Sequence, residues 1–191
     1  TLSAKTISTG FQKFWNFNSG PEFAKITLEN ILDELKNNRK IIATLKLDGS
    51  LFIRSVAEKE LILRTRGSFG FEHHDATAPE IEIFKQKYPK VFDTSLYCDR
   101  VHLLFEWVTP NNQIVIKYNE PDLYLLGAIK ETHGGIKTLS TIDELKEIAS
   151  HLEVKLVEHF EISSVKDWYE FYSNTINHRE IEGYVLRLYN E

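Results

Sequence analysis

Apolar residues recur at helical spacing in several stretches of this sequence, which is the pattern of helices with one buried face. Thr27 can cap the first stretch, because its hydroxyl can accept a hydrogen bond from a free amide of the first turn. Ser140 or Thr141 can do the same for the third. Pro89 ends the second, since the residue before a proline disfavours helical backbone angles. The predicted helices span residues 27–38, 79–88, 141–150 and 164–173.

Apolar runs and alternating apolar and polar positions predict β-strands between these helices. The strands are expected at residues 41–47, 50–57, 61–65, 101–108, 113–118, 123–130, 154–161 and 184–189. Asp48-Gly49 separates the first two and is typical of a hairpin turn, so it predicts that these two strands pair with each other. Short turns between successive strands favour antiparallel sheets, and the expected fold class is α+β.

The composition is that of a folded domain. The chain has 191 residues, of which 42% are hydrophobic and 27% charged, enough to build a hydrophobic core. No repeat, low-complexity run or Gly/Pro/Ser-rich linker divides it, so we expect one domain over residues 1–191. The sequence contains no methionine, and we therefore expect it to begin inside a longer protein.

Composition also excludes several classes of protein. No stretch approaches the roughly 18 apolar residues that span a bilayer, and no secretory signal opens the chain, so we expect no membrane insertion and no secretion. The single cysteine, Cys98, excludes an intramolecular disulfide framework and a thiolate zinc site. It predicts a reducing compartment, the cytoplasm of the host or source cell. A net charge of −5 argues against bulk electrostatic binding to nucleic acid, although a few local cations can still hold a nucleic-acid end.

Lys46 is out of place in the apolar run Ile-Ile-Ala-Thr-Leu-Lys-Leu. A lysine at the end of a buried strand either extends its ammonium to solvent or is held by anions. In the second case a rigid strand end beside Gly49 would fix the amine in place as a nucleophile. Gly49 would also let a ligand approach the backbone closely.

Other charged residues stand out for similar reasons. Glu106 interrupts an apolar strand and needs a partner there, either a structural cation or a ligand. Arg64 and Arg66 occupy alternate positions, so on one strand they would share a face and could clamp a phosphate. Glu182 precedes a glycine that opens an apolar strand. The cluster His73-His74-Asp75 is not favoured as a metal site, because no further ligand has matching spacing.

The order of these residues resembles the motifs of the covalent nucleotidyltransferases, the superfamily of polynucleotide ligases and mRNA capping enzymes. The resemblance is strongest to the phage T4 RNA ligase 1 family and covers nearly the whole chain. Lys46-Leu47-Asp48-Gly49-Ser50 is similar to motif I of that family. The other matching segments are residues 11–18, 64–68, 104–108, 112–118 and 182–187. Leu51 stands where DNA ligases have an arginine, which favours the RNA ligase branch.

The resemblance implies an ATP-grasp-like nucleotidyltransferase core of antiparallel sheets flanked by helices, and the activity of an ATP-dependent RNA ligase. Lys46 would attack the α-phosphorus of ATP and carry AMP as a lysyl phosphoramidate (lysyl-AMP). The AMP would pass to an RNA 5′-phosphate, and a 3′-hydroxyl would then seal the strand. Glu182 would bind or help to position Mg²⁺, for which Mn²⁺ can substitute.

The resemblance assigns further side chains to the nucleotide. Glu106 would accept hydrogen bonds from the ribose hydroxyls, Arg66 would contact phosphate, and Lys13 would approach the polyphosphate or its metal. Tyr118 and Leu45 would complete the nucleotide-binding set. The expected partners are RNA ends, with no membrane and no protein partner.

Two alternatives stay open at this point. A DNA ligase or a GTP-using capping enzyme would share the chemistry, and labelled ATP and GTP would separate them. A nucleotide- or RNA-binding domain without catalysis would lack Lys46, Glu106 or Glu182, and all three are present. The family's motif V, a Lys-x-Lys pair after motif IV, is not found in these 191 residues. We therefore expect a domain trimmed at both ends, which can bind nucleotide and yet adenylylate itself poorly.

Overall fold

The computed structural model describes residues 6–67, 78–112, 116–176 and 181–188. The chain divides into two compact units, each built from two separate segments of sequence. Unit 1 comprises Thr1–Phe11 and Asp48–Val157, and unit 2 comprises Gln12–Leu47 and Glu158–Glu191. No linker marks this division in the sequence, because each unit is assembled from segments that are far apart along the chain.

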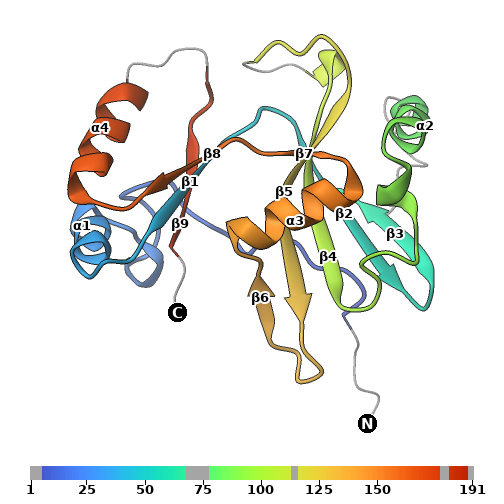
Figure 1. Cartoon of the computed structure of the whole chain (residues 1–191), viewed down its shortest axis with the longest axis horizontal. Coiled ribbons are helices and arrows are strands. Elements are labelled where there is room, and N and C mark those ends of the chain that lie inside the picture. Colours follow the sequence, from blue (N-terminus) through green and yellow to red (C-terminus); the bar gives the residue numbers. More distant parts are fainter. Residues whose placement is uncertain (1–5, 68–77, 113–115, 177–180, 189–191) are drawn as a thin grey trace. The chain divides into compact units, whose positions relative to one another are not determined.

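Unit 2 contains a three-stranded antiparallel sheet with β1 (Ile41–Leu45) in the centre. The neighbours of β1 are β8 (His159–Ile162) and β9 (Tyr184–Leu188), so the central strand pairs with two strands from the end of the chain. The helices α1 (Leu28–Lys36) and α4 (Val165–Thr175) lie beside this sheet (Figure 1). A short 3-10 turn, η1, covers Glu22–Ala24.

One apolar cluster holds unit 2 together. Thr27 caps α1 in a reciprocal capping box with Asn30, and Ser164 caps α4 by accepting from the amide of Asp167. These caps fix where each helix begins, so that its apolar stripe faces the sheet. The buried members of the cluster are Ile31, Leu35, Ile41, Ala43, Ile162 and Trp168.

Unit 1 contains a larger sheet with the strand order β3-β2-β4-β5-β6. These pairs are antiparallel, and a short strand, β7, joins β5 in parallel. The strands are β2 (Ser50–Ala57), β3 (Glu60–Arg64), β4 (Val101–Val108), β5 (Asp122–Glu131), β6 (Lys137–Leu139) and β7 (Lys155–Leu156). The helical elements are α2 (Ala78–Lys87), η2 (Pro89–Phe92), η3 (Pro110–Asn112) and α3 (Ile142–Leu152).

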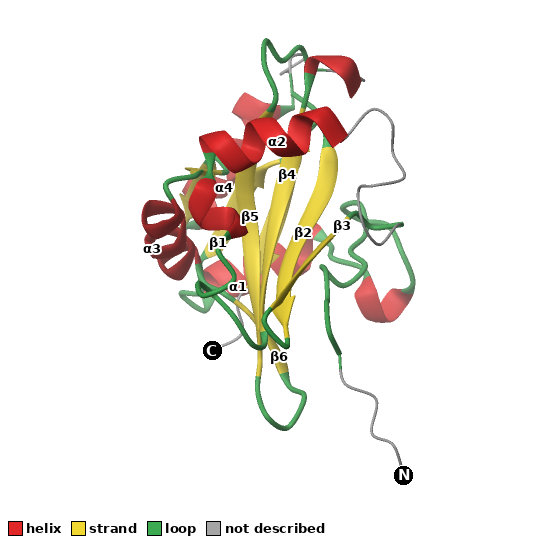
Figure 2. Cartoon of the chain, turned by 90° about the vertical axis from the view of Figure 1, so that its right-hand side faces the viewer, coloured by secondary structure: helices red, strands yellow, loops and turns green. Residues whose placement is uncertain are grey.

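The two faces of the large sheet have different covers. On one face α2 packs against the strands through Phe84, whose ring meets Trp107 edge to face at 6.2 Å (Figure 2). On the other face the N-terminal segment of unit 1 lies against the strands. There Phe11 packs against a cluster that contains Ile53 and Leu104. Both faces are therefore largely buried, which is why the strands read as nearly continuous apolar runs.

Arg54 is a buried cation in the centre of unit 1 and is 0% exposed. Its guanidinium donates four hydrogen bonds of 2.6–3.0 Å to the main-chain carbonyls of Val91, Asp93, Leu96 and Tyr97. Burial lowers the pKa of Arg54 to about 10. This side chain fastens the loop that precedes β4 onto the sheet.

The α+β class and the four predicted helices are confirmed, with Thr141 rather than Ser140 as the cap of α3. The hairpin expected at Asp48-Gly49 is wrong, because β1 and β2 belong to different sheets. The strand expected over 154–161 breaks into β7 and β8, which also lie in different sheets. The strand expected over 113–118 is absent at 116–118, and its first half lies outside the described residues. No helix in the described ranges is long and apolar enough to cross a membrane.

Candidate functional site

Lys46 directly follows β1, the central strand of unit 2, and its main chain is held on both sides. Its N–H donates a 2.9 Å hydrogen bond to the carbonyl of Gly183, and the N–H of Leu45 donates one of 2.8 Å to Glu158. The Lys46 ammonium forms an ion pair with the carboxylate of Glu182. The two side chains are 42% and 31% exposed, so the amine is fixed in position and still accessible from solvent.

Gly183 makes this pairing possible. Its φ of +145° is a backbone conformation that side chains with a Cβ rarely adopt. The turn brings Glu182 to Lys46 immediately before β9 begins, with Tyr184 paired to Leu45. Two residues that the sequence singled out separately thus form one contact, and the backbone around both is tied to the same strand pair.

The other expected residues of unit 2 are placed differently. Leu45 is the half-buried last residue of β1. Lys13 is exposed, and its ammonium lies 3.8 Å from the centre of the Trp15 ring in a cation–π contact. The described contacts therefore place Lys46 beside Glu182, whereas Lys13 contacts Trp15.

In unit 1 a buried carboxylate organises the residues after Lys46 in motif I. Asp48 is 3% exposed and accepts a 2.8 Å hydrogen bond from the N–H of Ile116. The N–H of Asp48 donates to the Tyr118 hydroxyl at 3.2 Å. Burial raises the pKa of Tyr118, and the nearby carboxylates of Asp48 and Glu106 raise it further. Asp48, Glu106 and Tyr118 therefore form a single cluster.

Sequence reasoning gave no role to Asp48, although it lies in the K-x-D-G motif. The structure shows that it anchors Tyr118 and the loop that leads to it. The sequence did contain an indication of this role, because an aspartate that is buried among apolar residues needs hydrogen-bond donors. What the sequence could not show is that a donor to this carboxylate, the N–H of Ile116, comes from 68 residues further along the chain.

Gly49 is required by the packing of β2 against β4. A Cβ at this position would collide with the main-chain carbonyl of Trp107 and would lie 3.1 Å from Cγ of Glu106. The glycine therefore lets β2 start against β4. Within β4, Glu106 is half-buried and lies in register between Leu51 of β2 and Tyr124 of β5.

The two arginines expected on one strand face do not act as a pair. Arg64 is the last residue of β3 and donates to the Ser8 hydroxyl at 2.8 Å and to the Thr65 carbonyl at 3.1 Å. Burial lowers the pKa of Arg64. Arg66 lies beyond the end of the strand and is exposed. Only Arg66 is placed to meet a ligand from solvent, and Arg64 serves the fold.

Sulfur and imidazole sites for a metal are not formed in the part of the chain that the structure describes. No group of three or more His, Cys, Asp or Glu residues gathers there. The residues His73, His74 and Asp75 lie outside the described ranges. Glu182 remains as one accessible carboxylate. That donor set fits Mg²⁺, which keeps several waters and takes one or two carboxylates together with substrate phosphates.

Comparisons with known proteins identify the family and the fold. A family model described as RNA ligase matches residues 2–191. The fold is similar to a mutant of the Naegleria gruberi RNA ligase with ATP and Mn, at 16% identity and a TM-score of 0.63. That match covers 97% of this chain and 58% of the other. The same ligase with pyrophosphate matches at 16% identity and a TM-score of 0.61, covering 98% of this chain and 58% of the other.

A third solved structure, an archaeal ATP-dependent RNA ligase, shares the fold at 12% identity and a TM-score of 0.52. The match covers 80% of this chain and 41% of that one. The chain thus spans less than two thirds of the length of the solved ligases that it matches. Since the family model nevertheless extends over residues 2–191, the chain belongs to the T4-type RNA ligase family.

Proposed function

We propose that residues 1–191 form the adenylylation domain of an ATP-dependent RNA ligase that joins a 5′-phosphate to a 3′-hydroxyl. The observation that carries this proposal is the fixed, accessible ammonium of Lys46 and its ion pair with Glu182. Both residues stand in segments that resemble motifs of that family. A nucleophilic lysine must be held in a defined position, and it needs a neighbouring group that can accept its proton. The contact with Glu182 would meet both requirements.

In the first step the neutral amine of Lys46 attacks the α-phosphorus of ATP. A nitrogen–phosphorus bond forms, and the bond from that phosphorus to the bridging oxygen breaks, so that pyrophosphate leaves. The nitrogen loses two protons in all, one before the attack and one after it. A carboxylate oxygen of Glu182 is hydrogen-bonded to the ammonium and would take the first. The half-exposed side chain can release the second to solvent.

Other residues would hold the nucleotide. Glu106 would accept hydrogen bonds from the ribose hydroxyls, with Tyr118 fixed beside it by Asp48. Arg66 and Lys13 are exposed cations that would contact phosphate oxygens. Leu45 would line the nucleotide site.

Glu182 would hold Mg²⁺ or Mn²⁺, and a bound divalent ion supplies positive charge that offsets the charge of the phosphates. The fit rests on one accessible carboxylate, which this kind of ion accepts because it retains water ligands. The same carboxylate contacts Lys46 in this structure. Glu182 would therefore contact both the amine of Lys46 and the ion that binds the phosphates, and would hold the two close to each other.

The later steps follow the same bond exchange. An oxygen of the RNA 5′-phosphate attacks the phosphorus of lysyl-AMP, the nitrogen–phosphorus bond breaks, and the nitrogen of Lys46 regains its two protons from solvent. The 3′-hydroxyl of the other RNA end then loses its proton to solvent and attacks the 5′-phosphorus; a phosphodiester forms as the bond from that phosphorus to the oxygen of AMP breaks, and AMP leaves. RNA ends are thus the proposed partners, and the cytoplasm of the host or source cell is the proposed location.

Mass spectrometry of the purified chain tests the proposal. With ATP and Mg²⁺ we expect one added adenylate, on the peptide that contains Lys46. Lys46→Ala should abolish the adduct and leave the fold intact. Lys40→Ala is the matched control, because Lys40 lies next to the same strand and also pairs with a glutamate, Glu161, at 2.7 Å.

The result also separates the alternatives. An adduct on Lys46→Ala would show that another residue is the nucleophile. An adduct with labelled GTP and none with ATP would identify a capping-type nucleotidyltransferase. Transfer of AMP to a DNA 5′-phosphate in preference to RNA would identify a DNA ligase. Nucleotide binding without any adduct would identify a domain that binds without catalysis.

A further inference from the structure

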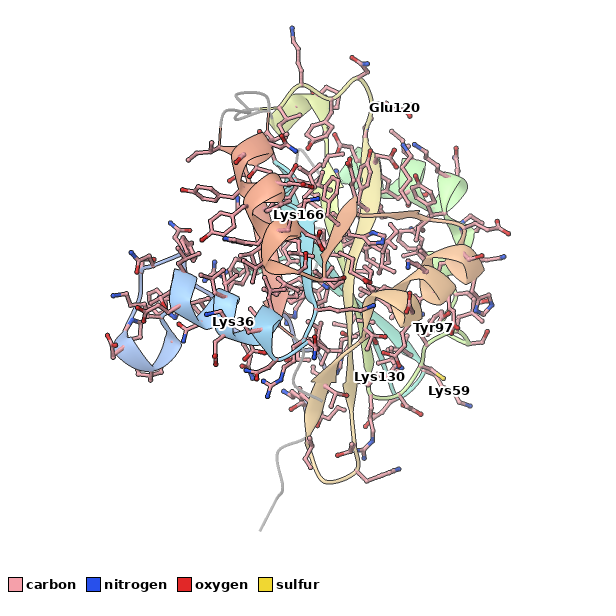
Figure 3. The ribbon with its side chains drawn as sticks, turned by 60° about the vertical axis from the view of Figure 1, so that its left-hand side comes forward. Lys36, Lys59, Tyr97, Glu120, Lys130 and Lys166 are labelled. Carbon is pink, nitrogen blue, oxygen red and sulfur yellow. The ribbon has the colours of Figure 1, made fainter. Side chains whose placement is uncertain are left out.

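The connection between β4 and β5, residues 109–121, is held against α2 near both of its ends. Thr109 at its beginning is hydrogen-bonded to Glu80, and Glu120 near its end pairs with Lys87 at 3.2 Å. Glu80 and Lys87 are two helical turns apart, so they lie on one side of α2. Glu120 lies at the upper end of the large sheet in Figure 3. One helix thus fixes the place where this connection leaves β4 and the place where it returns to β5.

Glu80 is a buried carboxylate in the first turn of α2 and is only 4% exposed. Its Oε1 accepts a 2.7 Å hydrogen bond from the Thr109 hydroxyl and a 3.2 Å hydrogen bond from the side-chain amide of Asn111. The Thr109 hydroxyl in turn accepts from the N–H of Asn111 at 3.2 Å. Together these three hydrogen bonds tie the start of the connection to α2 in one arrangement.

The second carboxylate oxygen of Glu80 is not used in the same way. This atom, Oε2, is buried and has no hydrogen-bond partner among the residues that the structure describes. The first turn of a helix favours negative charge, which offsets part of the cost of burying such an atom. Glu80 therefore acts on the connection as an acceptor through Oε1, and an amide oxygen in the same place can make the same contacts.

The later part of the same connection belongs to the cluster around Asp48. The N–H of Ile116 donates to the Asp48 carboxylate at 2.8 Å, and the Tyr118 hydroxyl accepts from the N–H of Asp48 at 3.2 Å. Only a few residues separate Asn111 from Ile116, and each spans at most about 3.6 Å. A displacement at the start of the connection therefore reaches Tyr118.

We propose that Glu80 is a positioning residue of the nucleotide site, which acts by fixing the β4–β5 connection that carries Tyr118. The proposal rests on the proposed function, because it takes Tyr118 as part of the nucleotide-binding set. It goes beyond that function in giving a role to α2, which lies outside every segment that resembles a family motif. A connection that is ordered before ATP arrives lowers the entropic cost of binding.

The first test measures self-adenylylation of the full chain over a range of ATP concentrations. Wild-type adenylylation is established first, so that failure of the proposed function is seen separately. Glu80→Met removes the acceptor and keeps an apolar stem, and Thr109→Val removes the donor. Each should raise the half-saturating ATP concentration about tenfold, the loss of one good hydrogen bond. The maximal rate should stay within about twofold.

Conservative variants show which property of each side chain is needed. Glu80→Gln keeps an acceptor at the position of Oε1, and Thr109→Ser keeps the hydroxyl, so both should stay within about twofold of the wild type. Glu82→Gln is the matched control, because Glu82 lies on the same helix, is 65% exposed and pairs only with Lys85 among the described ion pairs. It should leave the half-saturating ATP concentration unchanged.

A second measurement does not depend on adenylylation. In the NMR spectrum of the full chain with isotope-labelled tyrosine rings, the Tyr118 signal is the one that Tyr118→Phe removes. Glu80→Met and Thr109→Val should shift this signal, and Glu80→Gln should leave it in place. A general loss of stability would instead change the signals of all the tyrosines, which separates positioning from a merely structural role.

The proposal is overturned if Glu80→Met leaves the half-saturating ATP concentration within about twofold of the wild type, or leaves the Tyr118 signal unchanged. It is equally overturned if Glu80→Gln is as impaired as Glu80→Met, because the site would then need the charge and not the acceptor. If the wild type forms no adduct, the proposed function fails and the Tyr118 signal alone decides the role of Glu80. Circular dichroism accompanies each variant, and if Glu80→Met proves unfolded, Thr109→Val takes its place in both measurements.

Discussion

The ammonium of Lys46 and the carboxylate of Glu182 meet although 136 positions of sequence separate them. The reason is the register of the sheet in unit 2, where Leu45 pairs with Tyr184 in adjacent antiparallel strands. The residues just beyond the two paired ends are brought together, and the Lys46 N–H bonds to Gly183 between them. The sheet thus determines the contact, and the side chains determine its chemistry.

Glu182→Gln should slow the formation of lysyl-AMP by about 10- to 100-fold at saturating ATP, because the amide keeps the shape but neither accepts the proton nor binds a divalent ion as strongly. Single-turnover adenylylation over a Mg²⁺ titration measures both effects. Glu161→Gln breaks the comparable Lys40 pair at the other edge of the sheet and should leave the rate unchanged. An unaltered rate and Mg²⁺ dependence in Glu182→Gln would remove Glu182 from the mechanism.

Arg66→Ala should slow adenylylation by about tenfold without abolishing it, since it removes one of several cations that we propose contact phosphate. Arg64→Ala provides the contrast, because Arg64 donates to Ser8 inside unit 1. That variant should lose stability in urea and keep most of its rate once it is folded. The interpretation fails if the two variants show the reverse pattern.

Arg54→Leu should lower the free energy of unfolding by about 3 to 5 kcal/mol, because four main-chain carbonyls lose their donor in a buried region. Urea unfolding measures the loss. Arg39→Ala removes an exposed pair with Glu34, 49% and 23% exposed, and should change the stability by less than about 1 kcal/mol. Equal losses in the two variants would contradict the role given to Arg54.

Asp122 should make stability depend on pH in the acid range. Burial by itself would raise the pKa of Asp122, but the hydrogen bonds from Lys155, Tyr88 and the amide of Leu123 outweigh it and lower the pKa. The folded value therefore lies below the unfolded value of about 3.9. The stabilisation is complete above that pH and is lost as the pH falls through the folded pKa.

Urea unfolding of the wild type and of Asp122→Asn tests this effect. At pH 7 the variant should be less stable by about 2 to 4 kcal/mol, since the amide leaves Lys155 without its counter-ion. The difference should hold down to about pH 5 and shrink below about pH 4. Asp143→Asn is the control, because Asp143 is 83% exposed. A difference that stays constant from pH 7 to pH 3 would be inconsistent with this assignment.

Local patterns in the sequence predicted the four helices and most of the strands, but they missed β6 and joined β7 and β8 into one strand. Thr27, Thr141 and Ser164 cap their helices as hydroxyl residues before apolar periodic stretches do. The strand over Val101–Val108 has the bounds that its apolar run predicts. Caps and periodicity act over a few residues, and for that reason a single sequence carries them.

The partners of the strands could not be predicted from local sequence patterns. Asp48-Gly49 has the composition of a hairpin turn, yet β1 and β2 enter different sheets. Trp107 and Tyr184 lie next to or near Glu106 and Glu182 in the sequence, and their rings pack within their own units, against Phe84 in the first case and Phe171 in the second. A segment that is half apolar can bury its apolar side chains against any suitable partner. The sequence of that segment alone therefore does not determine which strand or ring it packs against.

The sequence by itself determined the four helices and most of the strands, the lysine of the K-x-D-G motif, and the acidic and basic residues that need partners. Only the tertiary structure decided which of them meet: Lys46 with Glu182, Asp48 with Tyr118, and Tyr124 with Glu106 and Lys155. Propensity and burial depend on a residue and its near neighbours, whereas these contacts depend on strand registers between segments far apart in the chain.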